Sequence, residues 1–479
     1  MNRKEKKFLD DYEKKLNLSS TFQDIEKKII FENNQKKSKK WKLVFPSFFV
    51  SAVALTLILV LPMTSHEKPS YETALLRTPK SEVNTTLSSI DMTRDEYSDF
   101  THNELNDFSM KYASEYYSYF NSEENIVSSP LSLYMSLAMA VECSKGNTRG
   151  ELLRTLNMNY ESVARYTNAL YLISTKEFNK NDKIVSMERL TNSIWMQNNG
   201  IFNEDTLDVL SDSYYCYPYS VDFMNDNQKT NRMIKEFISD NTNGLINNDF
   251  NLGYETVFAL INTLYVKDIW SHDFEELPLT NENYTFINSD GTTRQSRLLI
   301  GQYVDGRIQE GEKYRTFFIS TENGYKLKFI LPKESYNLDD VFSESVLQEI
   351  NSIIDYEPYN DEYTINYKTR CFFPEFSVSS NGSIKSILNN MGIADLFESD
   401  KCNLKNIVEG DTYCSDVIQA NDLRVDRKGI EGSAVTIIID TGDTDKEVIY
   451  DDFIINKSFG FILTDSYDVP LFSGAIKTL

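Results

Sequence analysis

Histidines are the scarcest of the residues that could do acid–base chemistry in this 479-residue chain. There are three, His66, His102 and His272, and no two of them are close in sequence. A hydrolase triad needs a histidine as its general base, and histidine is the commonest transition-metal ligand. All three lie in polar stretches, so a surface hydrolase is the weakest functional hypothesis. We expect no metal site and no cofactor.

The cysteines are sparse and irregularly spaced. No CxxC pair occurs, which disfavours a zinc site, and one thiol must be left over if disulfides form. We expect these side chains mainly to be buried as small apolar groups. The five are Cys143, Cys216, Cys371, Cys402 and Cys414.

A strand-like segment that turns into a polar loop runs from Val425 to Phe453. At the two-residue period of a strand, one face carries small or apolar side chains and could be buried in a sheet. Residues 440–447 are acidic and polar, and Gly442 gives their backbone freedom to form an exposed loop. The segment could therefore be a loop in one state and a central strand in another. The apolar face consists of Ile430, Gly432, Ala434, Thr436 and Ile438.

A series of motifs lies before and after this segment: Asn125–Ser132, Lys145–Thr148, Leu190–Trp195, Ser220–Phe223, Asp240–Ile246, Ile261–Trp270, Phe329–Glu334, Phe373–Phe376, Met391–Ile393 and Pro470–Gly474. In the same order, these motifs resemble the signature regions of the serpin family. The resemblance covers roughly residues 103–479 and implies an α+β serpin fold. Its helices would pack around a large, mostly antiparallel sheet, with a mobile reactive loop at about 429–452.

The resemblance implies a suicide-substrate mechanism. A protease cleaves the reactive loop, and the cut loop inserts into the main sheet and traps the protease as its covalent acyl-enzyme. Insertion starts at a hinge, which here departs from the family pattern at Arg427-Lys428, in place of an acidic pair, and at Ile430, in place of a small hydroxyl residue. Ile430 would face the core after insertion. The predicted hinge consists of Gly429, Ile430, Glu431, Gly432, Ser433, Ala434, Val435 and Thr436.

Four residues are predicted, through the resemblance, to gate the opening of the sheet. Ser129 and Ser132 correspond to the family's paired serines beneath the central strands. Gln419 corresponds by spacing to the usual histidine partner and can both donate and accept hydrogen bonds. Trp270 corresponds to the tryptophan where insertion begins. Simple core packing would also explain each of them.

The reactive bond is predicted at Asp443-Thr444, about fourteen residues past Gly429 as is usual in inhibitory members. A position as late as Glu447 stays open because the loop length varies on that side. Asp443 would suit an acid-preferring protease and Lys446 a trypsin-like one, whereas cleavage near Ile439 would suit an elastase-like enzyme.

The region before the serpin-like part predicts a membrane anchor. Residues 1–42 form a Lys-rich tail with thirteen Lys and Arg against seven Asp and Glu. Residues 43–63 are uncharged and long enough to span a bilayer, and residues 64–102 resemble a polar linker. The positive-inside rule places the tail in the cytoplasm and residues 103–479 outside. A cleaved signal peptide and a buried core helix are weaker alternatives.

These features favour an inhibitor of an extracellular serine or cysteine protease, acting as a monomer held at the membrane through one N-terminal helix. The alternative is a non-inhibitory serpin that serves as a surface binding or sensing module. The chain carries a net charge of −23, which disfavours nucleic-acid binding. Its composition and anchor layout suggest a Gram-positive-type bacterial surface protein.

Overall fold

The structure is a computed structural model that describes residues 69–80, 85–90, 92–120, 123–180, 183–272, 274–276, 285–303, 308–353, 366–431 and 448–479. These residues belong to one compact unit from Lys68 to Leu479. The predicted tail (1–42) and membrane span (43–63) lie outside the described residues. Within the described ranges, no helix is long and apolar enough to cross a membrane.

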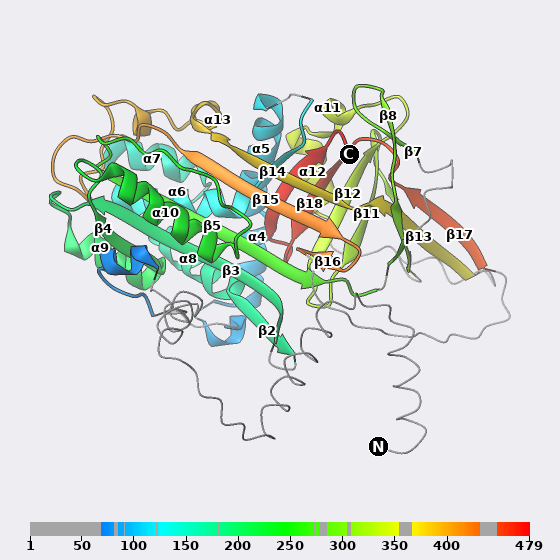
Figure 1. Ribbon diagram of the computed structural model, residues 1–479, viewed down its shortest axis with the longest axis horizontal. Coiled ribbons are helices and arrows are strands. Elements are labelled where there is room, and N and C mark those ends of the chain that lie inside the picture. Colours follow the sequence, from blue (N-terminus) through cyan, green and yellow to red (C-terminus); the bar gives the residue numbers. More distant parts are fainter. Residues whose placement is uncertain are drawn as a thin grey trace, which may run out of the picture. The chain divides into compact units, whose positions relative to one another are not determined.

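The main sheet has seven described strands and is mostly antiparallel, with one parallel pair, β3 and β4 (Figure 1). The mostly apolar sequence of Phe258–Ile269 suits a strand that is covered on both faces. The order across the sheet is β14 (Phe376–Ser383), β15 (Ile418–Asp426), β16 (Gly429–Ile430), β5 (Phe258–Ile269), β3 (Lys183–Gln197) and β2 (Lys176–Lys180), with β4 (Cys216–Val221) also paired to β3.

Two smaller sheets and a short hairpin complete the β structure. The second sheet is ordered β1 (Ile126–Ser128), β19 (Pro470–Ile476), β18 (Phe459–Thr464), β12 (Lys326–Pro332), β11 (Tyr314–Ser320) and β10 (Gln309–Glu310). The third is ordered β17 (Val448–Ile454), β13 (Asn366–Pro374), β9 (Leu298–Tyr303) and β6 (Glu275–Glu276), and the hairpin pairs β7 (Thr285–Ile287) with β8 (Thr293–Gln295).

The described helices pack on both faces of the main sheet. Neighbouring side chains of a strand point to opposite faces, so Ile194 joins the large core while Trp195 joins a second cluster under α10. The helices are α4 (Arg94–His102), α5 (Glu104–Tyr119), α6 (Pro130–Cys143), α7 (Gly146–Thr155), α8 (Tyr160–Ser174), α9 (Glu204–Ser213), α10 (Asn227–Asn241), α11 (Leu338–Val341), α12 (Glu344–Asn351) and α13 (Lys385–Asn390), with short 3₁₀ turns η1 (Ser70–Ala74), η2 (Leu87–Ser89) and η4 (Asp395–Phe397).

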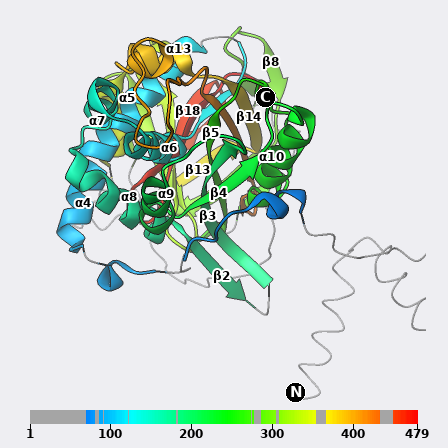
Figure 2. The ribbon, with the colours of Figure 1, turned by 90° about the vertical axis from the view of Figure 1, so that its left-hand side faces the viewer.

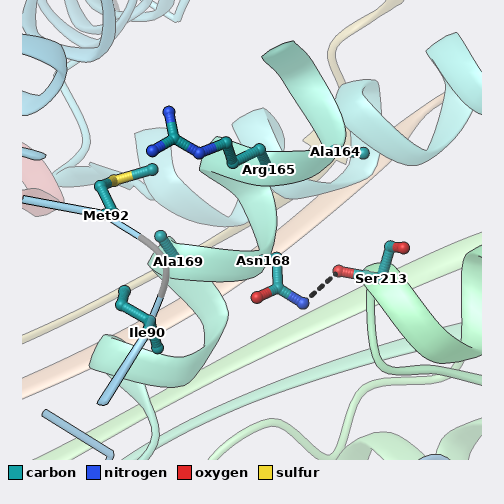
Figure 3. A pocket seen from close by; sticks show the side chains of 7 residues that line it. All are labelled: Ile90, Met92, Ala164, Arg165, Asn168, Ala169 and Ser213. Atoms are coloured by element: carbon teal, nitrogen blue, oxygen red, sulfur yellow. Dashed lines mark hydrogen bonds between the residues drawn. The ribbon is translucent and has the colours of Figure 1, made fainter. Parts of the chain in front are cut away.

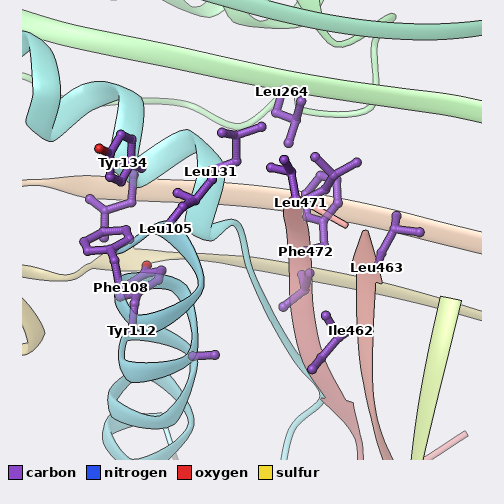
Figure 4. Close-up of a cluster of buried hydrophobic side chains, with 14 of the residues drawn as sticks. Leu105, Phe108, Tyr112, Leu131, Tyr134, Leu264, Ile462, Leu463, Leu471 and Phe472 are labelled. Atoms are coloured by element: carbon purple, nitrogen blue, oxygen red, sulfur yellow. The ribbon is translucent and has the colours of Figure 1, made fainter. Parts of the chain in front are cut away.

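The centre of the large core lies between α5, α6 and the last two strands. Apolar residues recur at helical spacing along α5, and its Leu105, Phe108 and Tyr112 point inward. Figure 4 shows these side chains beside Leu131 of α6 and Leu471 of β19. The main sheet and this helix pair thus share one apolar interior, which confirms the predicted α+β class.

The prediction of a polar linker over residues 64–102 needs correction. Tyr71 of η1 packs edge-on against Tyr219 of β4 and Phe237 of α10, with ring centroids 6.1 and 5.5 Å apart. Its hydroxyl donates to Asp240 at 3.0 Å. The segment around η1 lies along β4 and α10 (Figures 1 and 2). The sequence concealed this contact because a single aromatic side chain stands among polar residues.

Helix α4 also falls within the predicted linker, although it packs into the core. The Thr93 side chain caps its N-terminus by accepting a hydrogen bond from the Glu96 amide. In return, the Glu96 carboxylate accepts a hydrogen bond from the Thr93 amide. Tyr97 and Phe100 are buried. Because charged residues separate these aromatics, the stretch looks like a solvated chain in sequence. The folded unit therefore begins well before residue 103.

A buried ionic cluster lies where β2 and β3 meet the turn after β18. The Lys176 ammonium is 3.8 Å from a carboxylate oxygen of Glu188 and 3.6 Å from one of Asp465. Tyr325 donates a further hydrogen bond to Glu188 at 2.9 Å. Burial raises the pKa of Glu188 to about 8, although Lys176 acts in the opposite direction. Burial raises the pKa of Asp465 as well.

Candidate functional site

The predicted hinge begins as a tight hairpin between β15 and β16. Arg427-Lys428 forms the turn, and β16 then pairs with β15 on one side and with β5 on the other. Gly429 faces Ile269 and Ile430 faces Asp268 across the β5 side. Among the described strands, β15 and β5 do not pair directly with each other. The short strand β16 lies between them.

Gly429 is required at its position by close backbone contact. A Cβ atom there would collide with the carbonyl oxygen of Asp268 and come within 2.8 Å of the Ile269 Cα. Only glycine lets the hinge strand approach β5 this closely. The glycine predicted from the family pattern therefore has a local physical reason in this chain.

Ile430 is completely buried in the main sheet. The sequence predicted that it would face the core after loop insertion, and the structure shows it in the core as part of β16. Full burial of an isoleucine side chain contributes about 2 kcal/mol. A small hydroxyl residue would bury less apolar area, so the departure from the family pattern strengthens the seating of this hinge.

Glu431 marks the end of the described hinge. Its backbone is left-handed, with φ at 59°, and its amide donates to the Arg424 carbonyl at 2.8 Å. The Tyr265 hydroxyl donates to a Glu431 carboxylate oxygen. Partial burial raises the pKa of Glu431, with the Tyr265 hydrogen bond acting in the opposite direction. The carboxylate thus fastens the hinge to β5.

Trp270 fastens the same hairpin from the end of β5. Its indole N–H donates to the Asp426 carbonyl at 2.7 Å, and its backbone N–H donates to the Lys428 carbonyl at 3.1 Å. Both ends of the two-residue turn are therefore bonded to one residue. The structure places Trp270 at the hinge, where the sequence predicted that insertion begins.

Gln419 is the centre of a second, buried polar cluster. Its Oε1 accepts from the Tyr112 hydroxyl at 2.8 Å, from Asn421 Nδ2 at 2.9 Å and from the Ser129 amide at 3.2 Å. Its Nε2 donates to the Ser129 carbonyl at 2.9 Å. The Gln419 side chain therefore binds β15 both to the start of α6 and to α5. Glutamine can do this without a titrating proton.

Ser132, one helical turn later, connects α6 to the other side of the opening. Its amide donates to the Ser129 hydroxyl at 3.3 Å as part of the N-cap of α6, which also has proline at its first position. Its own hydroxyl donates to Asn262 of β5. Asn262 then donates to Asn192 of β3 at 2.7 Å. The first turn of α6 therefore binds both β15 and β5, the strands on either side of β16.

The four predicted gate residues thus lie at two places. Ser129, Ser132 and Gln419 meet under the sheet, whereas Trp270 lies eight residues along β5 from Asn262, about 26 Å away for an extended strand. The sequence did not assign Asn262 or Tyr112 to the gate. The one available signal for Asn262 was an amide that follows the apolar run 258–261 within a strand. Residues 432–447, including Gly432–Thr436 and the predicted bond Asp443-Thr444, lie outside the described residues.

Replacing Gln419 with alanine should destabilise the folded protein by about 2–4 kcal/mol, because buried donors and an acceptor lose their partner. Thermal unfolding would measure this as a lower midpoint. Gln228→Ala is the matched control, since Gln228 is exposed on α10. Equal midpoints for the two variants would show that the Gln419 cluster does not hold the sheet.

A small pocket lies elsewhere, where the N-terminal segment crosses α8 (Figure 3). Its volume is about 170 Å³. Asn168 of α8 donates across it to the Ser213 carbonyl at the end of α9, at 3.2 Å. The pocket is small and has no direct connection to the hinge. It is lined by Ile90, Met92, Ala164, Arg165, Asn168, Ala169 and Ser213.

This arrangement defines a class of protein: a large sheet with a hinge strand already seated between two central strands, and a polar cluster beneath that holds both. The family model described as "Serpin (serine protease inhibitor)" matches residues 103–478. The chain belongs to the serpin family. This confirms the resemblance seen in the sequence.

Individual relatives agree with this assignment. Human neuroserpin is 24% identical over 364 residues, which cover 71% of this chain and 82% of neuroserpin. Human antithrombin-III is 26% identical over 362 residues, covering 71% and 74%. The crystal structure of tengpin, a thermophilic serpin in its native state, superposes with a TM-score of 0.68 at 22% identity, covering 83% of this chain and 97% of tengpin. The last comparison shows the fold.

Proposed function

We propose that this serpin inhibits a serine-type endopeptidase as a suicide substrate. The observation that carries the proposal is the seating of β16, with Ile430 buried between β15 and β5. A loop that begins inside the sheet has its first inserted residues in place. After cleavage, further insertion would extend the ladder that Gly429 and Ile430 have started.

The two clusters support this mechanism in different ways. The Trp270 bonds hold the hairpin at the point where a cut loop would enter. The Gln419 and Ser132 bonds hold the strands that would have to separate. Because such bonds must break or rearrange as the sheet opens, they would control when insertion proceeds.

We further propose that the protein acts outside the cell, anchored by residues 43–63, with the tail in the cytoplasm. The uncharged length of this segment and the lysines before it support the proposal. The composition of the chain and the layout of this anchor support a bacterial surface protein. We also propose that it acts as a monomer, and the proposed anchor would place its protease partner outside the cell.

A non-inhibitory surface module is the second candidate. It is favoured by the bonds that fasten the hinge, above all the Tyr265 bond to Glu431, because a hinge held too firmly would insert slowly. Human thyroxine-binding globulin, a serpin solved with thyroxine, has the same fold with a TM-score of 0.64 at 18% identity, covering 80% of this chain and 99% of that one. If the cleaved loop inserted slowly, the protease would hydrolyse its acyl-enzyme and dissociate before it was trapped.

Incubation with proteases separates the two candidates. A chain of residues 68–479 includes η1 and α4, and it would be mixed with elastase-like, trypsin-like and acid-preferring enzymes, then denatured on a gel. The proposal predicts a covalent band at the summed mass, and the mass of the released C-terminal peptide locates the reactive bond. Clipping without a covalent band for every enzyme, together with unchanged heat stability after clipping, would favour the binding module.

A further inference from the structure

Two cysteines of the long connection between α13 and β15 differ from the other three. Cys402 and Cys414 are partly buried, whereas Cys143, Cys216 and Cys371 have no exposed surface. The pair is twelve residues apart in sequence, in a connection that ends at Ile418, the first residue of β15. Neither residue takes part in the hinge or in the Gln419 cluster.

The backbone brings these two cysteines together. The Cys402 amide donates to the Glu398 carbonyl at 2.8 Å, and the Cys414 amide donates to the Leu396 carbonyl at 2.9 Å. Residues two apart in a chain are separated by at most about 7 Å, so the two cysteines are fixed beside one short stretch. The Cys402 sulfur also accepts a hydrogen bond from the Cys414 backbone.

We propose that Cys402 and Cys414 form an intramolecular disulfide. The oxidant is a small-molecule disulfide or an oxidised thiol–disulfide oxidoreductase. One cysteine attacks the donor disulfide as its thiolate, forms a mixed disulfide and releases one donor thiol. The second cysteine attacks the mixed disulfide and releases the second donor thiol. Two cysteine thiols thus become one disulfide as one donor disulfide becomes two thiols.

The exchange belongs to folding, before the thiols are covered. In the folded state burial raises the pKa of Cys402 to about 11 and that of Cys414 to about 12. Thiolate is the reactive form, so few native molecules would react at neutral pH. The same burial protects the disulfide from reductants once it has formed. We therefore expect a structural disulfide that forms during folding in an oxidising environment.

The disulfide would link the segment just before β15 to the C-terminal end of α6. Beside Cys402, the Asn403 carbonyl accepts from the Lys145 amide at 2.9 Å, and Asn406 donates to the Glu142 carbonyl at 2.6 Å. Glu142 lies in the last turn of α6 and Lys145 just after the helix. On the other side, Cys414 is four residues before β15. The disulfide would therefore restrain a strand that borders the opening.

The test counts thiols in the full-length chain, refolded in detergent with a mixture of reduced and oxidised glutathione, then denatured and alkylated. We expect three alkylated thiols instead of five. Without reduction, trypsin should release residues 402–405 joined to residues 406–424, because Lys401, Lys405 and Arg424 bound these peptides. The joined mass is lower than the sum of the two peptides by two hydrogen atoms, and reduction separates them.

Variants identify the bonded pair. Cys402→Ser should leave all four remaining cysteines alkylated, whereas Cys371→Ser should leave two alkylated and keep the joined peptides. Reduction should lower the thermal midpoint of the wild type and leave that of Cys402→Ser unchanged. Five alkylated thiols in the refolded wild type, or a bond between any other cysteines, would overturn the proposal.

Discussion

Replacing Ile430 with arginine should expel β16 from the main sheet. The Ile430 side chain has no exposed surface, and burying an unpaired guanidinium there would cost several kcal/mol. The hairpin would leave its place between β15 and β5. If the protein is an inhibitor, the loop would then be cleaved as a substrate, and the yield of covalent complex should fall by more than about tenfold, since each ~1.4 kcal/mol is a factor of ten.

Trp270 offers a readout of this change that needs no protease. Its indole N–H donates to the Asp426 carbonyl within the hairpin, and the residue is 6% exposed. Loss of the hairpin should expose the ring and shift its fluorescence to longer wavelength. Ile430→Val is the control, because losing one methylene costs only about 0.5–1.5 kcal/mol. An arginine variant with wild-type emission and wild-type trapping would show that the seating of β16 is irrelevant.

The second large effect concerns the pH dependence of stability. The pKa of Glu188 is about 8 in the folded protein, well above its ordinary value near 4.3 in an unfolded chain. The folded state therefore holds this proton more tightly than the unfolded state. The stabilisation is fully present below about pH 4 and is lost as the pH rises to 8, by about 1.4 kcal/mol per pH unit in that window. Raising the pH from 5.5 to 8 should lower the thermal midpoint.

Glu188→Gln should remove most of this slope. Glutamine cannot ionise, it can still accept the Tyr325 hydrogen bond, and it leaves Lys176 paired with Asp465. The variant should be more stable than the wild type at pH 8. Glu161→Gln, on an exposed position of α8, serves as the control and should follow the wild-type curve. A slope unaltered by Glu188→Gln would assign the pH dependence to another group.

The parts of this molecule that could be predicted from the sequence are those that depend on local periodicity or on the spacing of motifs. The apolar stripe of α5 and the alternation that buries Ile430 both follow from the period of a helix or strand. Glycine at position 429 and Gln419 under the sheet were located by their spacing within family motifs. In each case, the relevant neighbours are close in sequence or are fixed by the order of the motifs.

The unpredicted parts depend on partners far apart in the chain. The Ser132 bond to Asn262 joins residues 130 positions apart, and the Tyr71 bond to Asp240 joins residues 169 apart. No periodicity announces such a contact, because each side chain looks like an ordinary polar or surface residue in its own segment. The cluster of Lys176, Glu188 and Asp465 was missed for the same reason.

The packing of η1 gives the fold a mechanical property. The first described residues of the chain, which follow the N-terminal region, are bound to α10 and β4. Tyr71 packs against α10, and the Leu76 amide donates to the Pro218 carbonyl of β4 at 2.9 Å. Tension applied from the N-terminal side of the chain would enter the domain at this point. Because α10 packs on β5, the pulling force would be transmitted to a strand beside the hinge. If residues 43–63 anchor the chain as proposed, a pull on that anchor would act on the strand beside the hinge.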